Sequence, residues 1–308
     1  MSEMYKKSGV NLDEAEKLNA KLKSALKTKN LGAFAGAVEI ANLGLKLVNC
    51  CDGIGSKIIP LYERKMFREI AVDLIAANLN DMATRPARAV SFADYIAVNR
   101  LDSSAISAII TELENELQKY GCELIGGETS EMPHLLRDGV IDICGFAIGV
   151  EKDVKFQPVQ NGDLVIGLKS SGIHANGFTL IRKLFAEGRL SDVEFEETLV
   201  PAYIYYNEIQ QLWDNNLIKT AANITGGGIF DNLIRVIPEG LALELNYNNI
   251  PSQSIFEKLK TITGDEMYKV FNCGAGFCVV AGCDNLAAVE EICRNYEPFI
   301  LGKVKEAE

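Results

Sequence analysis

The chain has 308 residues, of which 48% are hydrophobic and 24% are charged, and its net charge is −11 at pH 7. This length is sufficient for two domains with large cores. The acidic balance argues against broad binding to nucleic acid or to an anionic membrane, because both require a basic surface, but a local basic pocket for a phosphorylated small molecule remains compatible with it.

No apolar run approaches the roughly 20 residues that a membrane-spanning helix needs, and the first residues lack the apolar core of a signal peptide. The chain has eight cysteines and two histidines, with no CxxC pair and no spacing typical of zinc ligands. We therefore expect a cytoplasmic protein with reduced thiols, without bound zinc and without association with membranes or nucleic acid.

Apolar periodicity predicts alternating helices and strands in the first half of the chain. An amphipathic, lysine-rich helix is expected at 11–28, and the small residues at 31–40 are expected to lead into a strand. The other segments expected here are strands at 46–52, 89–98, 122–125 and 140–150, and helices at 63–79 and 104–120.

Residues 151–163 combine charges, a proline and an Asn-Gly turn, which is typical of a linker. We therefore predict an N-terminal domain at 1–154 and a C-terminal domain at 155–308. In the second domain we expect strands at 163–168, 241–246, 275–282 and 299–304, and helices at 178–188, 202–213, within 224–238, 252–262 and 283–295. This alternation predicts a two-domain protein of the α/β (α+β) class.

The segment CDGIGSK at 51–57 is the first of four polar clusters at the ends of expected elements. Asp52 follows a strand. Gly53 and Gly55 permit a phosphate to approach backbone N–H groups, and Lys57 can add positive charge. The Walker A spacing is absent, so the cluster fits either a phosphate-binding turn or an ordinary turn.

The segment NLNDM at 78–82 places Asn80 and Asp81 at the end of an otherwise apolar helix. A carboxylate is unfavourable near the negative end of the helix dipole. This local cost suggests a task such as holding Mg²⁺, while a solvated last turn is the alternative.

The segment LIGGETSEMP at 124–133 carries two carboxylates and two hydroxyls directly after a glycine pair. We expect Gly126 and Gly127 to form a sharp turn after a strand, so that Glu128 and Thr129 face a Mg²⁺–nucleotide complex. Carboxylates are the hard oxygen ligands that Mg²⁺ takes when it bridges nucleotide phosphates. A capping arrangement for a following turn is the alternative.

Two glycine-bearing loops in the second half each open a predicted helix, SSGIHANGF at 170–178 and NITGGGIF at 223–230. The N–H groups of a helix N-terminus are suited to a substrate phosphate. His174 is a candidate acid or base, although a lone histidine is more often structural. Together, the four clusters favour a nucleotide–Mg²⁺ site facing a phosphorylated substrate.

The chain resembles the phosphoribosylformylglycinamidine cyclo-ligases, or aminoimidazole ribonucleotide synthetases, of purine biosynthesis over nearly its whole length. The residues that carry the resemblance are YKKSGVN (5–11), DGIGSK (52–57), ND (80–81), GCELIGGETSEMP (121–133), SSGIHANGF (170–178), TGGG (225–228) and DEMYKVFNCGAGF (265–277). The GGETSEMP run together with the EMYKVFNCGAGF run is specific to this enzyme. DGIGSK is similar to a motif of the wider superfamily, which includes thiamine-monophosphate kinase, selenophosphate synthetase and a hydrogenase maturation factor.

The resemblance implies two α/β domains per subunit, with N-terminal strands pairing across a homodimer into a barrel-like interface. It implies that ATP and formylglycinamidine ribonucleotide give aminoimidazole ribonucleotide, ADP and phosphate. In such enzymes ATP is expected to activate the formyl oxygen as a phosphorylated imidate, which the amidine nitrogen attacks to close the ring. Such chemistry depends on positioning and charge neutralisation more than on a protein nucleophile.

The resemblance also implies roles for individual residues. Mg²⁺–ATP is expected to be held by Asp52, Asp81 and Glu128, and the catalytic residues are expected to be Asp52, Asp81, His174 and Lys23, the last on an N-terminal segment that folds over the nucleotide. ATP is expected to contact Gly53, Gly55, Lys57, Gly126, Gly127, Glu128 and Thr129. The substrate is expected to contact His174, Asn176, Gly177, Thr225, Gly226, Gly227 and Gly228.

The chain departs from the resemblance at three places. LGAFAGA at 31–37 replaces a richer glycine run, PARA at 86–89 stands where relatives often carry Gly-Ala-Glu-Pro, and Asn223 stands where a histidine is common. An amide does not titrate, so an acid/base role of that histidine cannot transfer, which leaves His174 as the main imidazole candidate.

Two other functions fit the sequence less well. One is a small-molecule kinase of the same superfamily, against which the EMYKVFNCGAGF block argues. The other is a non-catalytic nucleotide-binding scaffold, against which the intact Asp52, Asp81, Glu128 and Lys57 argue.

Overall fold

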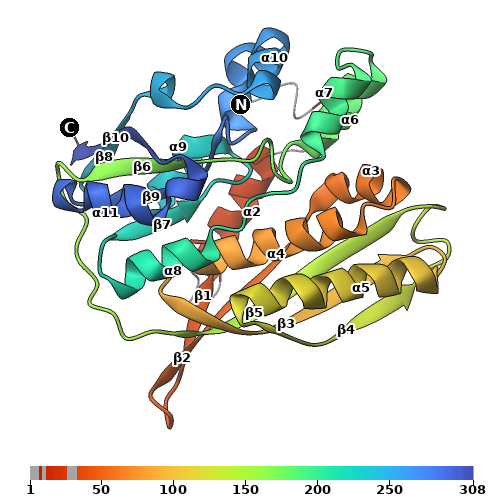
Figure 1. The fold of residues 1–308 in the computed structure, drawn as a ribbon, viewed down its shortest axis with the longest axis horizontal. Coiled ribbons are helices and arrows are strands. Elements are labelled where there is room, and N and C mark those ends of the chain that lie inside the picture. The colour runs from red at the N-terminus through yellow and green to blue at the C-terminus, as the bar shows by residue number, and fades with distance from the viewer. Residues whose placement is uncertain (1–6, 9–11, 26–32, 308) are drawn as a thin grey trace.

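The computed structural model describes residues 7–8, 12–25 and 33–307 and contains two five-stranded sheets with helices packed on them (Figure 1). The first sheet lies in the N-terminal half and the second in the C-terminal half. Strand β5 of the first sheet ends at Glu151, and strand β6 of the second begins at Leu164. The expected α/β (α+β) class with two sheet-containing halves is confirmed, while the boundary between residues 154 and 155 stays a prediction.

The N-terminal sheet has the strand order β1-β2-β5-β3-β4. The β3–β4 pair is parallel, and the other three pairs are antiparallel. The five strands are β1 (Gly36–Ile40), β2 (Leu45–Gly53), β3 (Ala87–Val98), β4 (Glu123–Glu131) and β5 (Ile141–Glu151). This order places β4 at one edge of the sheet and β1 at the other.

Helices α4 (Phe67–Ala83) and α5 (Ser103–Leu117) cover one face of this sheet. Helix α5 begins where the carboxylate of Asp102 accepts hydrogen bonds from the N–H groups of Ser104 and Ala105, which is a typical N-cap. Twelve of the 17 residues of α4 are buried, because it packs on the sheet on one side and on the C-terminal half on the other.

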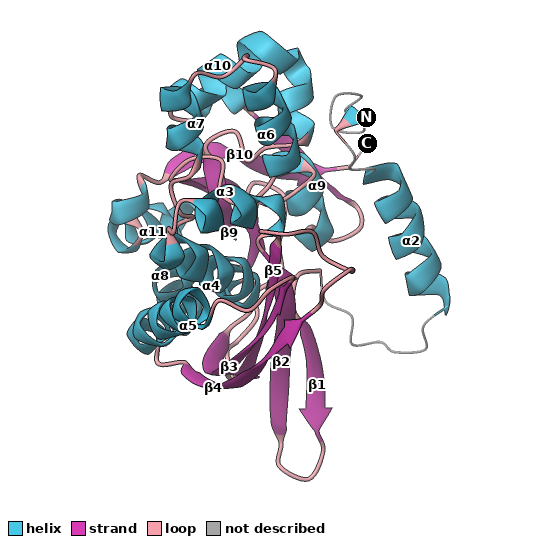
Figure 2. Ribbon diagram, turned by 90° about the vertical axis from the view of Figure 1, so that its right-hand side faces the viewer, coloured by secondary structure: helices cyan, strands magenta, loops and turns pink. Residues whose placement is uncertain are grey.

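The opposite face of the N-terminal sheet has no cover among the described residues (Figure 2). Strand residues alternate between the two faces, and the uncovered face carries apolar side chains from several strands. Val38, Ile125 and Phe146 on this face are 44%, 61% and 42% exposed. An apolar sheet face of this kind usually has a partner.

The C-terminal sheet has the order β7-β9-β6-β10-β8, and all its pairs are antiparallel. Its strands are β6 (Leu164–Lys169), β7 (Thr220–Asn223), β8 (Leu241–Leu245), β9 (Ala275–Ala281) and β10 (Phe299–Glu306). The helices of this half are α6 (Phe178–Ala186), α7 (Asp192–Thr198), α8 (Tyr206–Asp214), α9 (Gly228–Leu233), α10 (Ser254–Thr263) and α11 (Leu286–Ile292). Every residue of β9 is buried, as expected for a strand inside a sheet with helices on its faces.

Helix α4 lies between the two halves and meets α8 of the C-terminal half (Figure 1). The indole N–H of Trp213 donates to the carbonyl of Ala83 at 3.0 Å. The hydroxyl of Tyr206 donates to the carbonyl of Ala87 at 2.7 Å and accepts from the N–H of Ala89 at 2.6 Å. These bonds join α8 to the end of α4 and to the start of β3, so the C-terminal half supplies polar partners to the N-terminal half.

Some expected elements differ from the structure. The helix expected at 63–79 is instead the pair α3 (Ile58–Glu63) and α4, separated at Lys65, whose φ of 56° breaks the helix. Helix α7 and strand β7 were not expected. The N-terminal helix is confirmed as α2 (Leu12–Ala25), while its expected continuation to residue 28 lies outside the described residues.

Helix α2 stands apart from both sheets in Figure 2, with Leu18 and Leu22 at 55% and 40% exposure. Within residues 7–8, 12–25 and 33–307, no helix combines the length and the hydropathy that crossing a membrane requires.

Candidate active site

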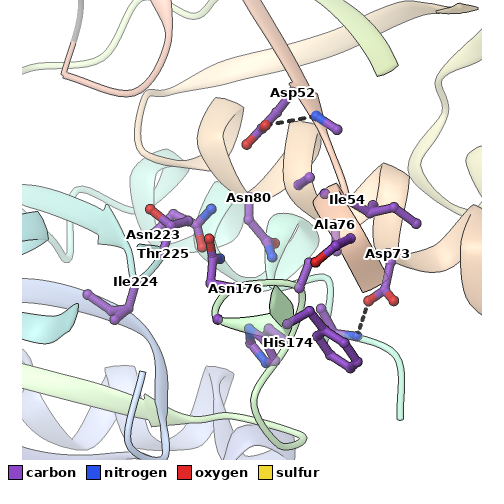
Figure 3. A pocket seen from close by; sticks show the side chains of 18 of the residues that line it. Asp52, Ile54, Asp73, Ala76, Asn80, His174, Asn176, Asn223, Ile224 and Thr225 are labelled. Carbon is purple, nitrogen blue, oxygen red and sulfur yellow. Dashed lines mark hydrogen bonds between the residues drawn. The ribbon is translucent and has the colours of Figure 1, made fainter. Parts of the chain in front are cut away.

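A cavity of about 280 Å³ lies where the end of β2 meets helix α4 and two loops of the C-terminal half (Figure 3). In Figure 3, Asp52 lies at the top, His174 at the bottom and Asn80 between them, while Asn223, Thr225 and Asn176 gather at one side. The N-terminal half contributes residues 52–56, Asp73, Ala76, Ala77 and Asn80, and the C-terminal half contributes residues 174–179, Ala202 and 223–225. The structure therefore brings together the first, second and fourth clusters expected from the sequence.

Asp52 is held at the end of β2 by the side chain of Asn78 on α4. The Asn78 side chain accepts from the N–H of Asp52 at 3.2 Å and donates to its carbonyl at 3.1 Å. One carboxylate oxygen of Asp52 accepts from the N–H of Gly53 at 2.7 Å. Desolvation by the surrounding protein raises the pKa of Asp52, against this hydrogen bond, which lowers it.

Asp81 lies in the last turn of α4, and its Oδ1 accepts a 2.8 Å hydrogen bond from Nδ2 of Asn223 on β7. Burial raises the pKa of Asp81 to about 7, and the negative charge of Asp52 adds to this shift, whereas Asn223 and Arg235 oppose it. Two carboxylates that are both desolvated and mutually repelling are a suitable environment for a cation. The pair thus fits the expected Mg²⁺ site.

Within the described ranges, no three His, Cys, Asp or Glu side chains gather closely enough to hold a metal ion by themselves. Asp52 and Asp81 provide two hard oxygen ligands. An Mg²⁺ ion usually binds through one or two carboxylates and completes its shell with substrate phosphates and water.

Lys57 does not reach the cavity. Its side chain is fully buried, and Nζ lies 2.7 Å from Oδ2 of Asp73 and 2.8 Å from the carbonyl oxygen of Val200. Burial lowers the pKa of Lys57 and raises that of Asp73, while their ion pair opposes both shifts. The expected contact between Lys57 and a phosphate is therefore not supported by this geometry, because the ammonium group is already paired.

The buried Lys57–Asp73 pair positions the segment that enters α8. Asp73 also accepts from the N–H of Ala202 at 2.8 Å, and Asn80 bonds to Tyr203 and Tyr205 of the same segment at 2.8 and 2.9 Å. Sequence reasoning missed Asp73. The available signal was an acidic residue within an otherwise apolar helix, because a buried carboxylate is rarely left unpaired.

His174 lies in the first glycine loop at a φ of 60° and is 5% exposed. Its ring lies beside Tyr205, with ring centroids 6.2 Å apart, and packs against the backbone of Gly276, where a Cβ would stand 2.5 Å from Cε1. Burial, with a smaller effect of Lys57, lowers the pKa of His174 to about 3. The imidazole is therefore neutral at ordinary pH, and Nε2 has no hydrogen-bond partner within the described protein.

The second half of this loop leads into α6. Gly177 has a φ of 80°, and a Cβ there would stand 2.3 Å from the ring of Phe271, so glycine is required. The hydroxyls of Ser56 and Thr179 lie 2.9 Å apart and join this loop to the DGIGSK segment.

The second glycine loop is packed on the segment 264–269. A Cβ at Gly228 would stand 1.9 Å from the carbonyl oxygen of Tyr268, so only glycine fits. The side chain of Asn232 donates to the carbonyl of Gly228 at 2.7 Å and closes the loop onto α9. Among the expected substrate residues, Asn176, Gly177 and Thr225 line the cavity, and the Asn176 Oδ1 lies 3.5 Å from the Cβ position of Gly226.

Asn272 holds the first glycine loop, residues 170–178, in place through hydrogen bonds. Its Nδ2 donates to the carbonyl of Gly172 at 2.9 Å, and its Oδ1 accepts from Ser170 at 3.1 Å and from the N–H of Gly274 at 2.9 Å. The FNCG part of the 265–277 motif is thus a scaffold for the loop, a role that the sequence motif alone did not reveal.

The GGETSE segment corrects one expectation. Gly126 and Gly127 form no turn. Strand β4 continues without a turn through residues 123–131, and its pairing with β3 shifts register between Phe92 and Ala93. Gly127 is required because a Cβ there would stand 2.5 Å from Oδ1 of buried Asp94.

Glu128 and Thr129 cannot face one ligand from the same side, because consecutive strand residues point to opposite faces. Glu128 pairs in register with Tyr95 and lies on the uncovered face, where it accepts from the Ser130 hydroxyl at 3.2 Å. In the strand order, β4 is three strands from the β2 residue Asp52, which corresponds to roughly 14 Å at normal strand spacing. Within one chain, Glu128 therefore does not join the cavity.

Lys23 belongs to α2, and its side chain lies outside the described part of the structure. Its expected position over a nucleotide stays a prediction. Of the nucleotide-contacting residues expected from the sequence, Gly53 and Gly55 line the cavity, Lys57 is buried behind it, and Gly126, Gly127, Glu128 and Thr129 lie in the distant edge strand.

Two family models cover the chain. Residues 32–150 match the N-terminal domain of AIR synthase related proteins, and residues 160–308 match the C-terminal domain of the same proteins. Among curated proteins, the phosphoribosylformylglycinamidine cyclo-ligase of Clostridium perfringens is 36% identical over 307 residues, covering 94% of this chain and 91% of that relative. The enzyme of the same name from Oceanobacillus iheyensis is 33% identical and covers 100% of this chain and 98% of the relative.

Solved structures share the fold at low sequence identity. The structure of AaThiL complexed with AMPPCP and TMP has a TM-score of 0.70 at 16% identity, covering 97% of this chain and 94% of that chain. The HypE–HypF complex gives a TM-score of 0.71 at 16% identity, with coverages of 94% and 93%. At this identity the likeness establishes the fold alone.

Proposed function

This chain belongs to the AIR synthase related protein family, and from that premise we propose that it is a phosphoribosylformylglycinamidine cyclo-ligase. It uses ATP to close the ring of formylglycinamidine ribonucleotide, giving aminoimidazole ribonucleotide, ADP and phosphate. The reaction forms a C–N bond in de novo purine biosynthesis and is therefore a ligase reaction. The observation that carries this function is the full-length similarity to curated cyclo-ligases at 32–37% identity.

The cavity offers what such a reaction requires. Phosphorylation of the formyl oxygen needs a nucleotide whose phosphate charge is neutralised, and attack by the amidine nitrogen needs a substrate held in one orientation. Asp52 lines the cavity with Gly53–Gly55, and Asp81 lies behind the lining residue Asn223, to which it is hydrogen-bonded. These two carboxylates supply the metal-binding side. Asn176, Thr225 and the N-terminus of α6 supply polar groups on the opposite side for the ribose phosphate and the amidine.

Asp52 and Asp81 are the residues that would hold Mg²⁺, and the ion would neutralise the charge on the transferring phosphoryl group. The raised pKa of both carboxyls fits this role, because a cation offsets the partial desolvation of the two groups and the repulsion of Asp81 by Asp52. His174 contributes as a neutral hydrogen-bonding group, since its pKa of about 3 removes it from acid catalysis at neutral pH.

The test is a coupled assay of ADP release and aminoimidazole formation from ATP and formylglycinamidine ribonucleotide. Formation of both products in equal amounts supports the cyclo-ligase. ADP release without the imidazole product would indicate a kinase-like relative instead. Absence of ADP, with ATP still bound, would favour a nucleotide-binding scaffold.

We also propose that the protein is a homodimer that buries the uncovered face of the N-terminal sheet. The exposed apolar residues Val38, Ile125 and Phe146 on this face support the proposal. Glu128 lies on the same face, far from the Asp52–Asp81 pair of its own chain. If a second copy packs against this face, Glu128 can contribute to the active site of the partner chain.

Light scattering at micromolar protein concentration tests the association. A mass of two chains supports the dimer, and a mass of one chain would contradict it. Phe146→Glu, a charge on the uncovered face, is expected to give a folded monomer. The matched control Val193→Glu replaces an apolar residue that is 71% exposed on α7 and leaves the mass unchanged. A cytoplasmic location fits this function, and fractionation of cells tests it.

A further inference from the structure

The contact between Asn223 and Asp81 joins the two halves of the molecule at the cavity. Asn223 is the last residue of β7 and is 4% exposed. Its Nδ2 donates to Oδ1 of Asp81 at 2.8 Å. The two residues are 142 positions apart in the chain, so this hydrogen bond depends on the correct seating of the C-terminal sheet against α4.

Asn223 leads directly into the substrate loop. The N–H of the next residue, Ile224, donates to the carbonyl of Gly276 at 3.1 Å, and Thr225 lines the cavity. The backbone around Asn223 is also fixed, because β7 pairs with β9 and Asn223 stands opposite Phe277. The amide is therefore presented to Asp81 from a rigid strand rather than from a mobile loop.

The hydrogen bond leaves the two oxygens of the Asp81 carboxylate unequal. Oδ1 accepts the amide N–H, which fixes the plane of the carboxylate while both oxygens keep lone pairs for a cation. Groups that hydrogen-bond to a metal-binding side chain fix its orientation, and their loss weakens metal binding. An asparagine suits this task because its N–H donates to the carboxylate at any pH.

We propose that Asn223 is a positioning residue for Asp81, fixing the orientation of the carboxylate that would hold the metal ion of the metal–nucleotide complex, while the same strand sets the place of the substrate loop. The proposal rests on the proposed function for the identity of the nucleotide site. It goes beyond that function by giving the C-terminal half a direct part in metal binding. Asn223 acts through Asp81 and is not itself a catalytic residue.

Two variants separate the donor from the shape of the side chain. Asn223→Leu keeps the approximate shape, removes the N–H donor and adds no charge beside Asp81. Asn223→Ala removes the contact altogether. The control is Asn215→Ala, which deletes an exposed amide bonded to the carbonyl of Gln211 far from the cavity.

Binding of Mn²⁺ in the presence of ADP, followed by electron paramagnetic resonance, is the first readout because it does not require turnover. Both variants are expected to bind Mn²⁺ about 10- to 100-fold more weakly, while Asn215→Ala binds as the wild type does. In steady-state assays kcat falls and the Mg²⁺ requirement rises. The KM for formylglycinamidine ribonucleotide stays within about 3-fold, because the substrate loop itself is unchanged.

Unchanged Mn²⁺ binding by Asn223→Leu would overturn the proposal. A rise in the substrate KM with normal Mn²⁺ binding would do so as well, since it would assign Asn223 to substrate binding. If Asn223→Ala fails to fold, the near-isosteric leucine variant decides. A wild-type protein that binds Mn²⁺–ADP but forms no aminoimidazole would refute the proposed function and leave the metal measurement valid.

Discussion

Two glycine-bearing segments of the N-terminal sheet, DGIGSK at 52–57 and GGETSE at 126–131, have similar chemistry and different fates. Each follows an apolar run and combines glycines with acidic and hydroxyl side chains. The first leaves β2 in a tight turn into a cavity shared with the C-terminal half. The second continues as an edge strand, with Glu128 on a face that no described element covers.

The difference comes from what surrounds each segment. Residues 52–57 meet α4 and the C-terminal loops, so Asp52 becomes desolvated next to Asp81. Residues 126–131 pair with β3 on one side and have no described neighbour on the other. The same residue types thus line a cavity at 52–57, whereas at 126–131 they lie on a sheet face that no described element covers.

The largest expected effect belongs to the cavity. Asp81→Asn is expected to lower kcat by at least about 10²- to 10³-fold. The substitution removes one of the two carboxylates that would hold the metal ion, and the ion would neutralise the transferring phosphoryl group. Near-normal turnover in this variant would contradict the assignment of Asp81 to metal binding. It would also remove the contrast in function between the cavity and the edge strand β4.

The same variant has a stability signature without metal. The pKa of Asp81 is raised to about 7 in the folded protein, so its contribution to stability is present at acid pH and is lost as pH rises through that value. In the presence of a chelator, Asp81→Asn is therefore expected to be more stable than the wild type, with a difference that grows between about pH 4 and pH 7 and is constant above pH 7. Thermal unfolding at several pH values measures this difference.

The second prediction tests how firmly each segment is anchored. Asp73→Ala leaves Lys57 buried and unpaired and is expected to cost about 3–5 kcal/mol of unfolding free energy. Glu128→Ala on the exposed edge strand is expected to cost about 0.5 kcal/mol or less. Chemical denaturation of both variants measures the contrast, and equal costs would remove it.

The third prediction asks whether the two segments meet in a dimer. Asp81→Asn and Glu128→Gln are each expected to be nearly inactive. If Glu128 serves the partner's cavity, mixing the unfolded variants and refolding them gives heterodimers with one intact site, and activity returns to about a quarter of the wild-type value. No recovery, in a mixture shown by mass to contain heterodimers, would place Glu128 outside the site.

The smallest effect is expected at His174. Its pKa of about 3 keeps the imidazole neutral, so His174→Gln is expected to change the level of kcat/KM without changing its pH dependence between about pH 6 and pH 9. Loss of an acidic or basic limb from that profile would restore His174 as an acid or base.

Much of the fold followed from local sequence patterns, because apolar periodicity reports which side of an element is buried. One failure has a non-local cause, and another was an overlooked local signal. The glycine pair at 126–127 has the local composition of a turn, and only its parallel pairing with β3 makes it a strand. Helix α7 was detectable, since Ser191 and Glu194 form a capping box, a signal that the sequence contains.

The site was predictable in its residue types and less so in its partners. Asp52, Asp81, Asn176 and Thr225 were expected and lie in or beside the cavity. The pairing of Lys57 with Asp73 could not be read from the chain, because an acidic residue in an apolar helix signals that it has a partner but not which residue that partner is. The contact of Asn223 with Asp81 joins residues from different halves, and local periodicity carries no information about such a contact.

Helix α8 connects the two halves through side-chain hydrogen bonds and packing. Its residues Tyr206 and Trp213 satisfy backbone groups of β3 and α4, and α4 in turn has almost no exposed side to spare. Neither half can be exchanged for that of a relative unless the surfaces of α4 and α8 are exchanged with it. Substitutions on these two helices should therefore have accumulated in pairs, and chimeric proteins cut near residue 155 inherit mismatched partners even when both halves are individually sound.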